Sequence, residues 1–136
     1  MGFFDEAPEA ATVRQGHETL LIVEDEDSVR NLVASALRND GYELLLAKSA
    51  EDALRLDEQH KGPIDLLLTD AIMPGKSGIE LAAMMAARRP ALPVIIMSGY
   101  TEETLTGAPL DKPISLLQKP FTPRELRRRI RDMLDR

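Results

Sequence analysis

Four short apolar runs in this sequence each lead directly into a polar residue, and this pattern constrains the fold most. The runs and the residues that follow them are Leu20–Val23 before Glu24-Asp25, Leu66–Thr69 before Asp70, Val94–Met97 before Ser98, and Leu116–Gln118 before Lys119. Such runs are typical of strands in a parallel sheet that is buried on both faces. Ligands bind outside the carboxyl ends of these strands, so we expect the polar residues to meet at one edge.

The segments between the runs combine helical spacing with turn residues. A further strand is predicted over 42–47, and helices are predicted over about 28–38, 50–58, 79–89 and 123–134. The apolar face of the first helix is expected to comprise Val29, Leu32, Val33, Ala36 and Leu37, and that of the third Ile79, Ala82, Ala83 and Ala86. Pro109 and Pro113 leave room for only a short or irregular fourth helix near 101–105.

Five strands that alternate with helical segments predict an α/β doubly wound domain over 18–136. The flavodoxin-like strand order 2-1-3-4-5, with helices on both faces of a parallel sheet, suits this count. In that order the first and third strands are neighbours, which places Glu24 and Asp25 beside Asp70. Residues 1–17 show no sustained period and are expected to form a flexible extension before the domain.

The length and composition of the chain exclude several classes of protein. Its 136 residues suffice for one domain with a sizeable core and leave little room for a second. No apolar run approaches the ~20 residues of a membrane helix, and the start of the chain lacks the pattern of a signal peptide. The absence of cysteine excludes disulfides and thiolate metal sites, and it favours a cytoplasmic location.

Charge is distributed unevenly along the chain. Residues 119–136 carry a net charge of +4, whereas the remainder carries −10. Because residues before 119 carry this negative charge, direct binding of nucleic acid is not expected. The arginines at 127, 128, 129 and 131 are candidates for a local basic docking surface, although a solvated helix face is the ordinary interpretation of such a run.

Carboxylates that converge at one edge of a sheet repel each other, so a proton or a cation must lie among them. With no cysteine, and with histidine only at positions 17 and 60, the candidate ligands are all oxygen atoms. Oxygen ligands suit Mg²⁺ or Mn²⁺ rather than zinc. The alternative interpretation is that Glu24, Asp25 and Asp70 have no ligand and merely cap helices or keep the strand ends in contact with water.

Four motifs together resemble the receiver domain of two-component response regulators over residues 18–135. They are Leu21-Ile22-Val23-Glu24-Asp25-Glu26, Thr69-Asp70 with Met73-Pro74-Gly75 and Ser77-Gly78, Met97-Ser98-Gly99, and Gln118-Lys119-Pro120-Phe121. Each motif alone is weak, but their shared order and spacing are specific. The segments around Ser98 and Lys119 are most similar to receivers attached to hybrid histidine kinases.

The resemblance implies a role for each polar residue at the predicted edge. Asp70 is expected to be the phosphoacceptor, taking a phosphoryl group from a phosphohistidine on a histidine kinase or a phosphotransfer protein. The Mg²⁺ ligands would be Glu24, Asp25, Asp70 and the backbone carbonyl of Ile72. Lys119 would add positive charge, and the Lys119–Pro120 peptide bond is expected to be cis, as in the family. Ser98 would be the switch hydroxyl.

Three positions depart from the family pattern. Receivers often have aspartate where Glu24 stands, but glutamate is a common variant there and metal binding is expected to survive. Leu116 stands where many receivers have an aromatic switch residue, so we hypothesise that Tyr100 or the interrupted fourth helix carries the output instead. Ile72 stands where many receivers have a polar side chain, and beside Tyr100 it is expected to crowd an attacking water. Self-dephosphorylation is therefore expected to be slow.

Several alternatives stay open at this stage. A phosphatase of the haloacid-dehalogenase class would need an acid at position 72, where this chain has isoleucine. A pseudo-receiver that binds partners without being phosphorylated is the main alternative to a phosphorelay module, and neither is a stand-alone enzyme.

The chain is either a single-domain regulator, which its start at Met1 favours, or the receiver of a hybrid kinase. A homodimer through the fourth helix, fifth strand and last helix is a further hypothesis. Partner choice is expected mainly on the first helix, whose exposed positions are expected to include Arg30, Asn31 and Arg38.

Overall fold

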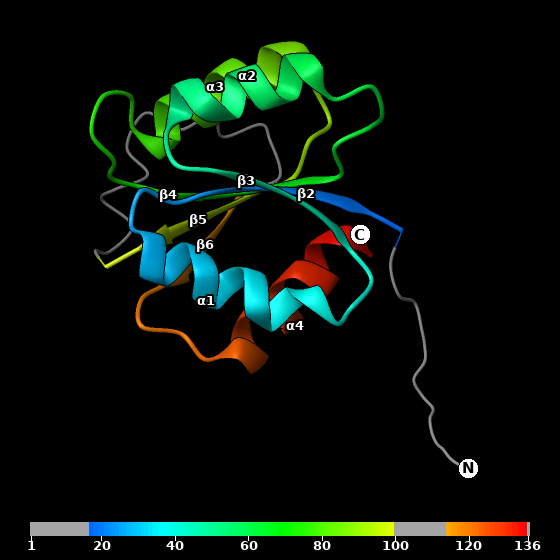
Figure 1. The fold of residues 1–136 in the computed structure, drawn as a ribbon, viewed down its shortest axis with the longest axis vertical. Coiled ribbons are helices and arrows are strands. Elements are labelled where there is room, and N and C mark those ends of the chain that lie inside the picture. The colour runs from blue at the N-terminus through cyan, green and yellow to red at the C-terminus, as the bar shows by residue number, and fades with distance from the viewer. Residues whose placement is uncertain (1–16, 100–113, 136) are drawn as a thin grey trace.

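The computed structural model describes residues 17–99 and 114–135 (Figure 1). Its elements are β2 (Thr19–Val23), α1 (Asp27–Arg38), β3 (Glu43–Ala47), α2 (Ala50–Gln59), β4 (Leu66–Asp70), α3 (Gly78–Arg88), β5 (Val94–Ser98), β6 (Ile114–Gln118) and α4 (Pro123–Leu134). The expected extension over 1–17, apart from its last residue, and the expected helix near 101–105 lie outside the described residues. Within the described part, no helix is long and apolar enough to span a bilayer.

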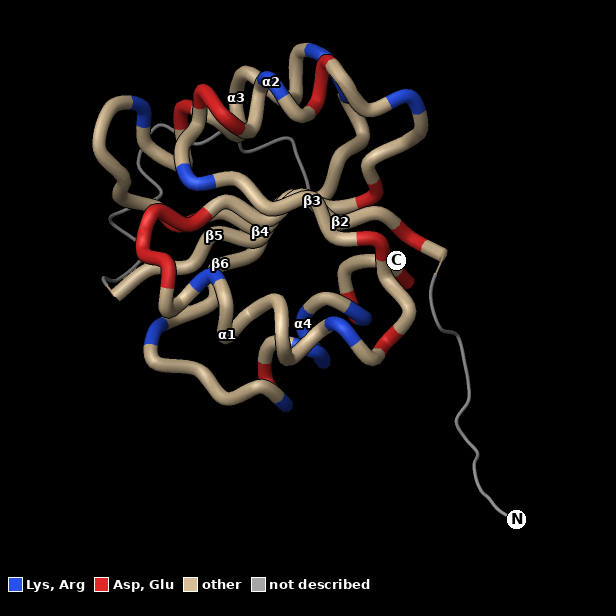
Figure 2. The backbone as a smooth tube through the Cα atoms, viewed as in Figure 1, with Lys and Arg blue, Asp and Glu red and all other residues tan. Residues whose placement is uncertain are grey.

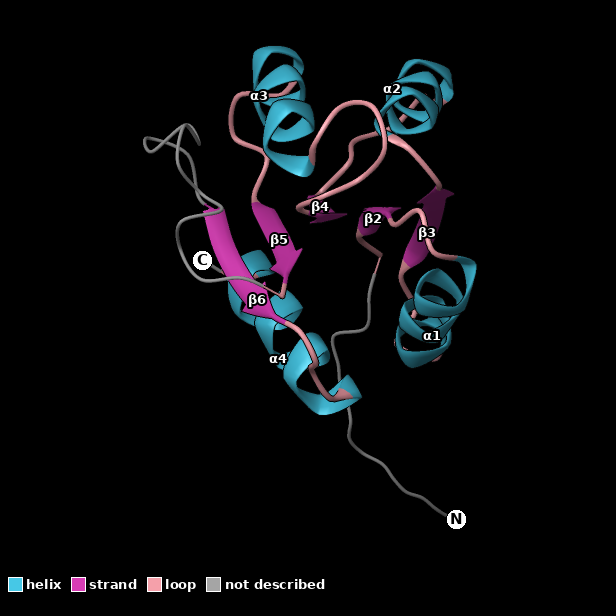
Figure 3. Cartoon of the chain, turned by 90° about the vertical axis from the view of Figure 1, so that its left-hand side faces the viewer, coloured by secondary structure: helices cyan, strands magenta, loops and turns pink. Residues whose placement is uncertain are grey.

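The five strands form one parallel sheet in the order β3-β2-β4-β5-β6. This order is the predicted 2-1-3-4-5 arrangement, and the flavodoxin-like doubly wound fold is confirmed. Helices α2 and α3 lie side by side on one face of the sheet, and α1 and α4 cover the other (Figures 1 and 3). The strands are therefore buried on both faces, as their unbroken apolar sequences predict.

Alternation along each strand divides the core into two layers. Leu21 and Val23 point toward α2 and α3, whereas Leu20 and Ile22 point toward α1 and α4. All four side chains are fully buried. Burial of such a side chain contributes about 1.5–3 kcal/mol, so the two layers together provide most of the driving force for folding.

Side-chain caps fix where three of the helices begin. The Ser49 hydroxyl accepts the backbone N–H of Asp52 before α2. Ser77 and Thr122 each form a capping box before α3 and α4, with the glutamate three residues later completing it. Such caps contribute about 1 kcal/mol each, and they fix the residue at which each loop from the sheet edge ends and its helix begins.

Sequence periodicity misjudged parts of two helix faces. Leu32 was expected on the buried face of α1, but 57% of its surface is exposed. On α3 the buried residues are Gly78, Leu81, Ala82 and Met85, whereas Ala83 is exposed. Because α3 is apolar on almost all sides, its sequence does not identify the face that meets the sheet. Strand β3 begins at Glu43, one residue later than predicted, and β4 begins at Leu66, although the apolar sequence predicts a strand from Ile64.

A buried carboxylate joins the two helices on the α2–α3 face. Asp57 of α2 accepts hydrogen bonds from Arg88 Nη1 at 2.9 Å and from Arg89 Nε at 2.7 Å. Burial by itself raises the pKa of Asp57, but the hydrogen bonds from the two arginines outweigh it and hold the pKa below its ordinary value of 3.8. The ion pairs therefore stabilise the packing of α2 against the end of α3.

Asp57→Asn is expected to lower the free energy of unfolding by about 2 kcal/mol near pH 7, because it removes charge-assisted hydrogen bonds. With its pKa lowered on folding, Asp57 contributes fully above the unfolded pKa near 3.8, and the contribution is lost as pH falls below it. Urea unfolding of wild type and variant from about pH 3 to pH 7 should show the difference shrinking at the acid end. A pH-independent difference would contradict this account, and Asp132→Asn, at an exposed position, is the matched control.

Candidate functional site

The predicted polar residues do meet at the carboxyl edge of the sheet. Glu24 and Asp25 follow β2, Asp70 and Ser98 are the last residues of β4 and β5, and Lys119 follows β6. The register of the sheet pairs Val23 with Thr69, which places the residues after them side by side.

Backbone hydrogen bonds continue the sheet beyond the ends of its strands at this edge. The N–H of Glu24 donates to the carbonyl of Ala47 at 3.0 Å, and the N–H of Lys119 donates to the carbonyl of Ser98 at 2.8 Å. After β4, the N–H of Ala71 donates to the carbonyl of Met97 at 2.9 Å. The main chain that carries the polar side chains is thus fixed by neighbouring strands.

Three carboxylates form a cluster at this edge. Glu24, Asp25 and Asp70 each offer one oxygen, and these oxygens lie within 4.8 Å of one another. Glu24 is 1% exposed and Asp70 9%, while Asp25 is open to solvent. Figure 2 shows the acidic run where β2 passes into α1. Carboxylate oxygens at such separations fit the ligand chemistry of Mg²⁺ or Mn²⁺.

The buried carboxylate of Glu24 is held by its own loop. Its Oε2 accepts the backbone N–H of Glu26 at 3.0 Å. Burial raises the pKa of Glu24, the hydrogen bond from Glu26 opposes this, and the nearby charge of Asp70 raises it further. The net effect is a raised pKa, although the charge and hydrogen bond of Lys119 also oppose it, and a further cation nearby would favour the ionised form.

Arg30 fixes the same loop, and sequence analysis missed this role. Its Nη1 donates to the backbone carbonyl of Glu24 at 2.8 Å, and it also pairs with Asp27. The side chain is only 17% exposed, so the expectation that Arg30 is an exposed position of α1 is wrong. Asn31 and Arg38 are exposed, as expected. Helical spacing alone could not separate Arg30 from them, since its partner is a loop carbonyl.

Lys119 contacts two of the three carboxylates. Its Nζ lies 3.2 Å from Asp70 Oδ1 and 3.3 Å from Glu24 Oε1. Burial lowers the pKa of Lys119, but the charges of Asp70 and Glu24 outweigh this and raise the pKa above its ordinary value. The ammonium is therefore held in its charged form beside Asp70. The Lys119–Pro120 peptide bond is cis, as the family resemblance implies.

A small pocket opens beside Asp70. It has a volume of about 230 Å³ and is lined by Asp70, Ala71, Ile72, Ser98, Gly99 and Lys119. Ser98 is buried, and Ile72 is 59% exposed at the same opening. Leu116 lies on β6 beside Ile96 and is half-buried. Tyr100 lies outside the described residues.

Gly78 lies unusually close to the chain at Asp70, and this contact was also missed from sequence. A Cβ atom at Gly78 would lie 2.0 Å from the backbone oxygen of Asp70 and 2.9 Å from its carbonyl carbon. The N–H of Gly78 donates to the carbonyl of Ala71 at 2.9 Å, which holds the two segments together. The only signal in the sequence is the pair Ser77-Gly78 within one of the four motifs, at the start of a helix.

Comparison with known proteins identifies the family. The family model of the response regulator receiver domain matches residues 20–131. Sensor kinase CckA of Brucella abortus (strain 2308) is 34% identical over 129 residues, which cover 94% of this chain and 14% of that protein. The crystal structure of the receiver domain from hybrid histidine kinase CckA is 37% identical, with a TM-score of 0.73, and the match covers 85% of this chain and 98% of that one.

A further solved structure is the response regulator TrrA of Thermotoga maritima in complex with Mg²⁺-BeF. It is 28% identical with a TM-score of 0.72, and the match covers 86% of this chain and 99% of that one. This chain spans only 14% of the sensor kinase and about half of two further curated relatives, at 50% and 52%. The family model nevertheless covers most of the chain, and the chain belongs to the response regulator receiver domains of two-component systems.

Proposed function

We propose that this receiver takes a phosphoryl group onto Asp70 from a phosphohistidine of a partner protein. The observation that supports the proposal is the placement of the Asp70 carboxylate in a small pocket, beside two further carboxylates and 3.2 Å from the ammonium of Lys119. One oxygen of Asp70 attacks phosphorus, the phosphorus–nitrogen bond of the phosphohistidine breaks, and its electron pair stays on the imidazole. The product is an aspartyl phosphate.

Glu24, Asp25 and Asp70, with the backbone carbonyl of Ile72, would hold Mg²⁺ or Mn²⁺ at this site. The oxygen donor set fits such an ion, as described above. When bound, the ion neutralises charge on the phosphoryl oxygens. Arg30 and the N–H of Glu26 keep the buried Glu24 oriented toward the cluster.

Lys119 and Ser98 would contact the phosphoryl group once it is on Asp70. The ammonium of Lys119 already lies against Asp70, so it can neutralise a phosphoryl oxygen without a large movement. Ser98 lines the same pocket, and its hydroxyl can donate to another phosphoryl oxygen. We assign Ser98 as the switch residue on this basis. Leu116 has no aromatic ring, so a signal cannot pass to a partner by rotation of a ring at that position.

The partner would be a histidine kinase or a histidine phosphotransfer protein. Leu32 is exposed on α1, which begins beside the site, and Ile72 is exposed at the pocket opening. We propose that these two exposed apolar side chains contact the partner when its phosphohistidine reaches Asp70. Asn31 and Arg38 add polar contacts on α1.

The main alternative is a pseudo-receiver that binds partners without phosphorylation. Incubation of the protein with Mg²⁺ and a small phosphoryl donor, followed by measurement of the intact mass, distinguishes the two. A mass increase of one phosphoryl group supports the phosphorelay function, and an unchanged mass supports the pseudo-receiver.

Ile72→Asn is expected to speed the loss of phosphate from phosphorylated Asp70. The isoleucine offers no hydrogen bond at the pocket opening, whereas an amide can orient an attacking water. One such hydrogen bond is worth roughly 0.5–1.5 kcal/mol, which corresponds to an increase of about 2- to 10-fold in the decay rate. The decay is followed by intact mass after the donor is removed. Ile72→Leu is the matched control, and equal decay rates in all three proteins would refute the explanation.

A further inference from the structure

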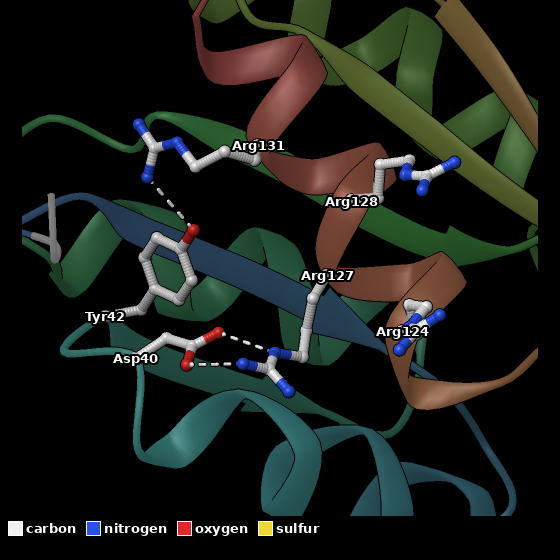
Figure 4. Close-up of a pocket in the computed structure, with 6 residues that line it drawn as sticks. All are labelled: Asp40, Tyr42, Arg124, Arg127, Arg128 and Arg131. Atoms are coloured by element: carbon white, nitrogen blue, oxygen red, sulfur yellow. Dashed lines mark hydrogen bonds and ion pairs between the residues drawn. The ribbon is translucent and has the colours of Figure 1, made fainter. Parts of the chain in front are cut away.

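A basic groove lies between α4 and the turn that joins α1 to β3 (Figure 4). It has a volume of about 500 Å³ and is lined by Asp40, Tyr42, Arg124, Arg127, Arg128 and Arg131. None of these residues lines the pocket at Asp70. The four arginines recur at helical spacing along one side of α4, and they stand out in a chain of net charge −6.

Two of the four arginines have structural partners. Arg127 Nε donates to Asp40 Oδ2 at 3.1 Å, which joins α4 to the end of α1. Arg131 donates to the hydroxyl of Tyr42 at 3.1 Å and to Glu18 at 3.0 Å. Figure 4 shows Arg131 at the hydroxyl of Tyr42 and Arg127 against the carboxylate of Asp40. These contacts account for Arg127 and Arg131 without any ligand.

The other two arginines have no such explanation. Within residues 17–99 and 114–135, no ion pair or hydrogen bond joins the side chain of Arg124 or Arg128 to another group. Like charges four residues apart on a helix destabilise it by about 0.2–0.5 kcal/mol. Arg124 also lies in the first turn of α4, where the helix dipole disfavours positive charge. Residues that oppose local stability in this way are expected at functional surfaces.

We propose that this groove binds an acidic α-helical segment of a partner protein. The stripe from Arg124 to Arg131 extends over about 10 Å of α4, and carboxylates at the same helical spacing on a second helix would match it. Arginine and tyrosine are also among the residue types enriched at the energetically important centres of protein interfaces.

The charge of the rest of the molecule favours a short acidic segment over larger polyanions. Outside residues 119–136 the chain carries a net charge of −10, which repels nucleic acid and anionic membranes that must approach over a wide area. An acidic helix needs to contact only the groove. Because the groove shares no residue with the pocket at Asp70, such a partner can bind without covering the phosphoacceptor.

The test uses the full chain and a synthetic helical peptide with glutamates at positions i, i+3, i+4 and i+7. Wild-type protein is expected to bind the peptide, with NMR shift changes confined to Tyr42 and the side chains of the α4 arginines. Arg124→Gln/Arg128→Gln is expected to weaken binding at least about tenfold, and higher salt should weaken it in wild type. The control is Arg55→Gln/Lys61→Gln, which removes equal charge from exposed positions outside the groove and should change affinity less than about twofold.

Several results would overturn the proposal. These are no binding of the peptide, an equal loss of binding in the control variant, or equally tight binding of duplex DNA or anionic vesicles by the wild type. A fall in the melting temperature of Arg124→Gln/Arg128→Gln would show that the arginines are structural, since relief of repulsion is expected to leave stability unchanged or raise it. Phosphorylation of this variant by a small donor should equal that of wild type, so failure here is distinguishable from failure of the proposed function.

Discussion

Asp70→Asn is expected to abolish the mass increase that the wild-type protein gains from a small phosphoryl donor in the presence of Mg²⁺. The amide that replaces the carboxylate is a poor nucleophile and cannot give a stable acyl phosphate. The substitution also removes one of the three carboxylates in the cluster formed with Glu24 and Asp25. We therefore expect the phosphorylated fraction to fall below detection in the intact mass spectrum.

Two comparisons make this result interpretable. Asparagine has nearly the size of aspartate, so the variant should keep its fold, which circular dichroism checks. Asp132→Asn changes an exposed carboxylate of α4 in the same way and should be phosphorylated like the wild type. A phosphoryl group retained in Asp70→Asn would place the phosphoacceptor elsewhere, and an unmodified wild type would favour the pseudo-receiver.

Gly78→Ala is expected to have the largest effect on stability of any single methyl group added near the site. Its Cβ would lie 2.0 Å from the backbone oxygen of Asp70, a separation at which α3 or β4 must move. The hydrogen bond from the N–H of Gly78 to Ala71 opposes that movement. Overpacking of this kind costs about 1–3 kcal/mol and occasionally more, and we expect the upper end of that range.

Urea unfolding measures this loss, and the phosphorylation rate shows whether Asp70 is displaced as well. Gly99→Ala is the matched control, because a Cβ there would have no heavy atom within 4 Å. Its free energy of unfolding should change by less than about 0.5 kcal/mol. Equal effects of the two substitutions would mean that the close approach at Gly78 is not what makes glycine necessary there.

The sheet and the placement of the polar residues could be predicted because both follow from local rules. Unbroken apolar runs identify buried parallel strands, and the polar residues that end them must then share an edge. Glu24 directly follows β2, as the sequence predicts, and β4 and β5 each run one residue past their predicted ends, to Asp70 and Ser98.

The contacts that support the site were harder to predict because they depend on tertiary packing. Arg30 binds a loop carbonyl that no periodicity reveals, and Gly78 is required by a backbone that approaches from β4. The buried face of α3 was misjudged because alanine and methionine occupy nearly every side of that helix. Output through Tyr100 stays a prediction.

The hydrogen bonds that extend the sheet beyond its strands fix the backbone of the candidate site before any partner binds. Fixing the backbone of one residue costs roughly 1–2 kcal/mol of conformational entropy. At Glu24, Ala71 and Lys119 the backbone is already fixed on folding by hydrogen bonds to the neighbouring strands, so this entropy is lost before any donor binds. In the phosphoryl transfer proposed above, little reorganisation of this backbone would therefore be needed when a donor arrives.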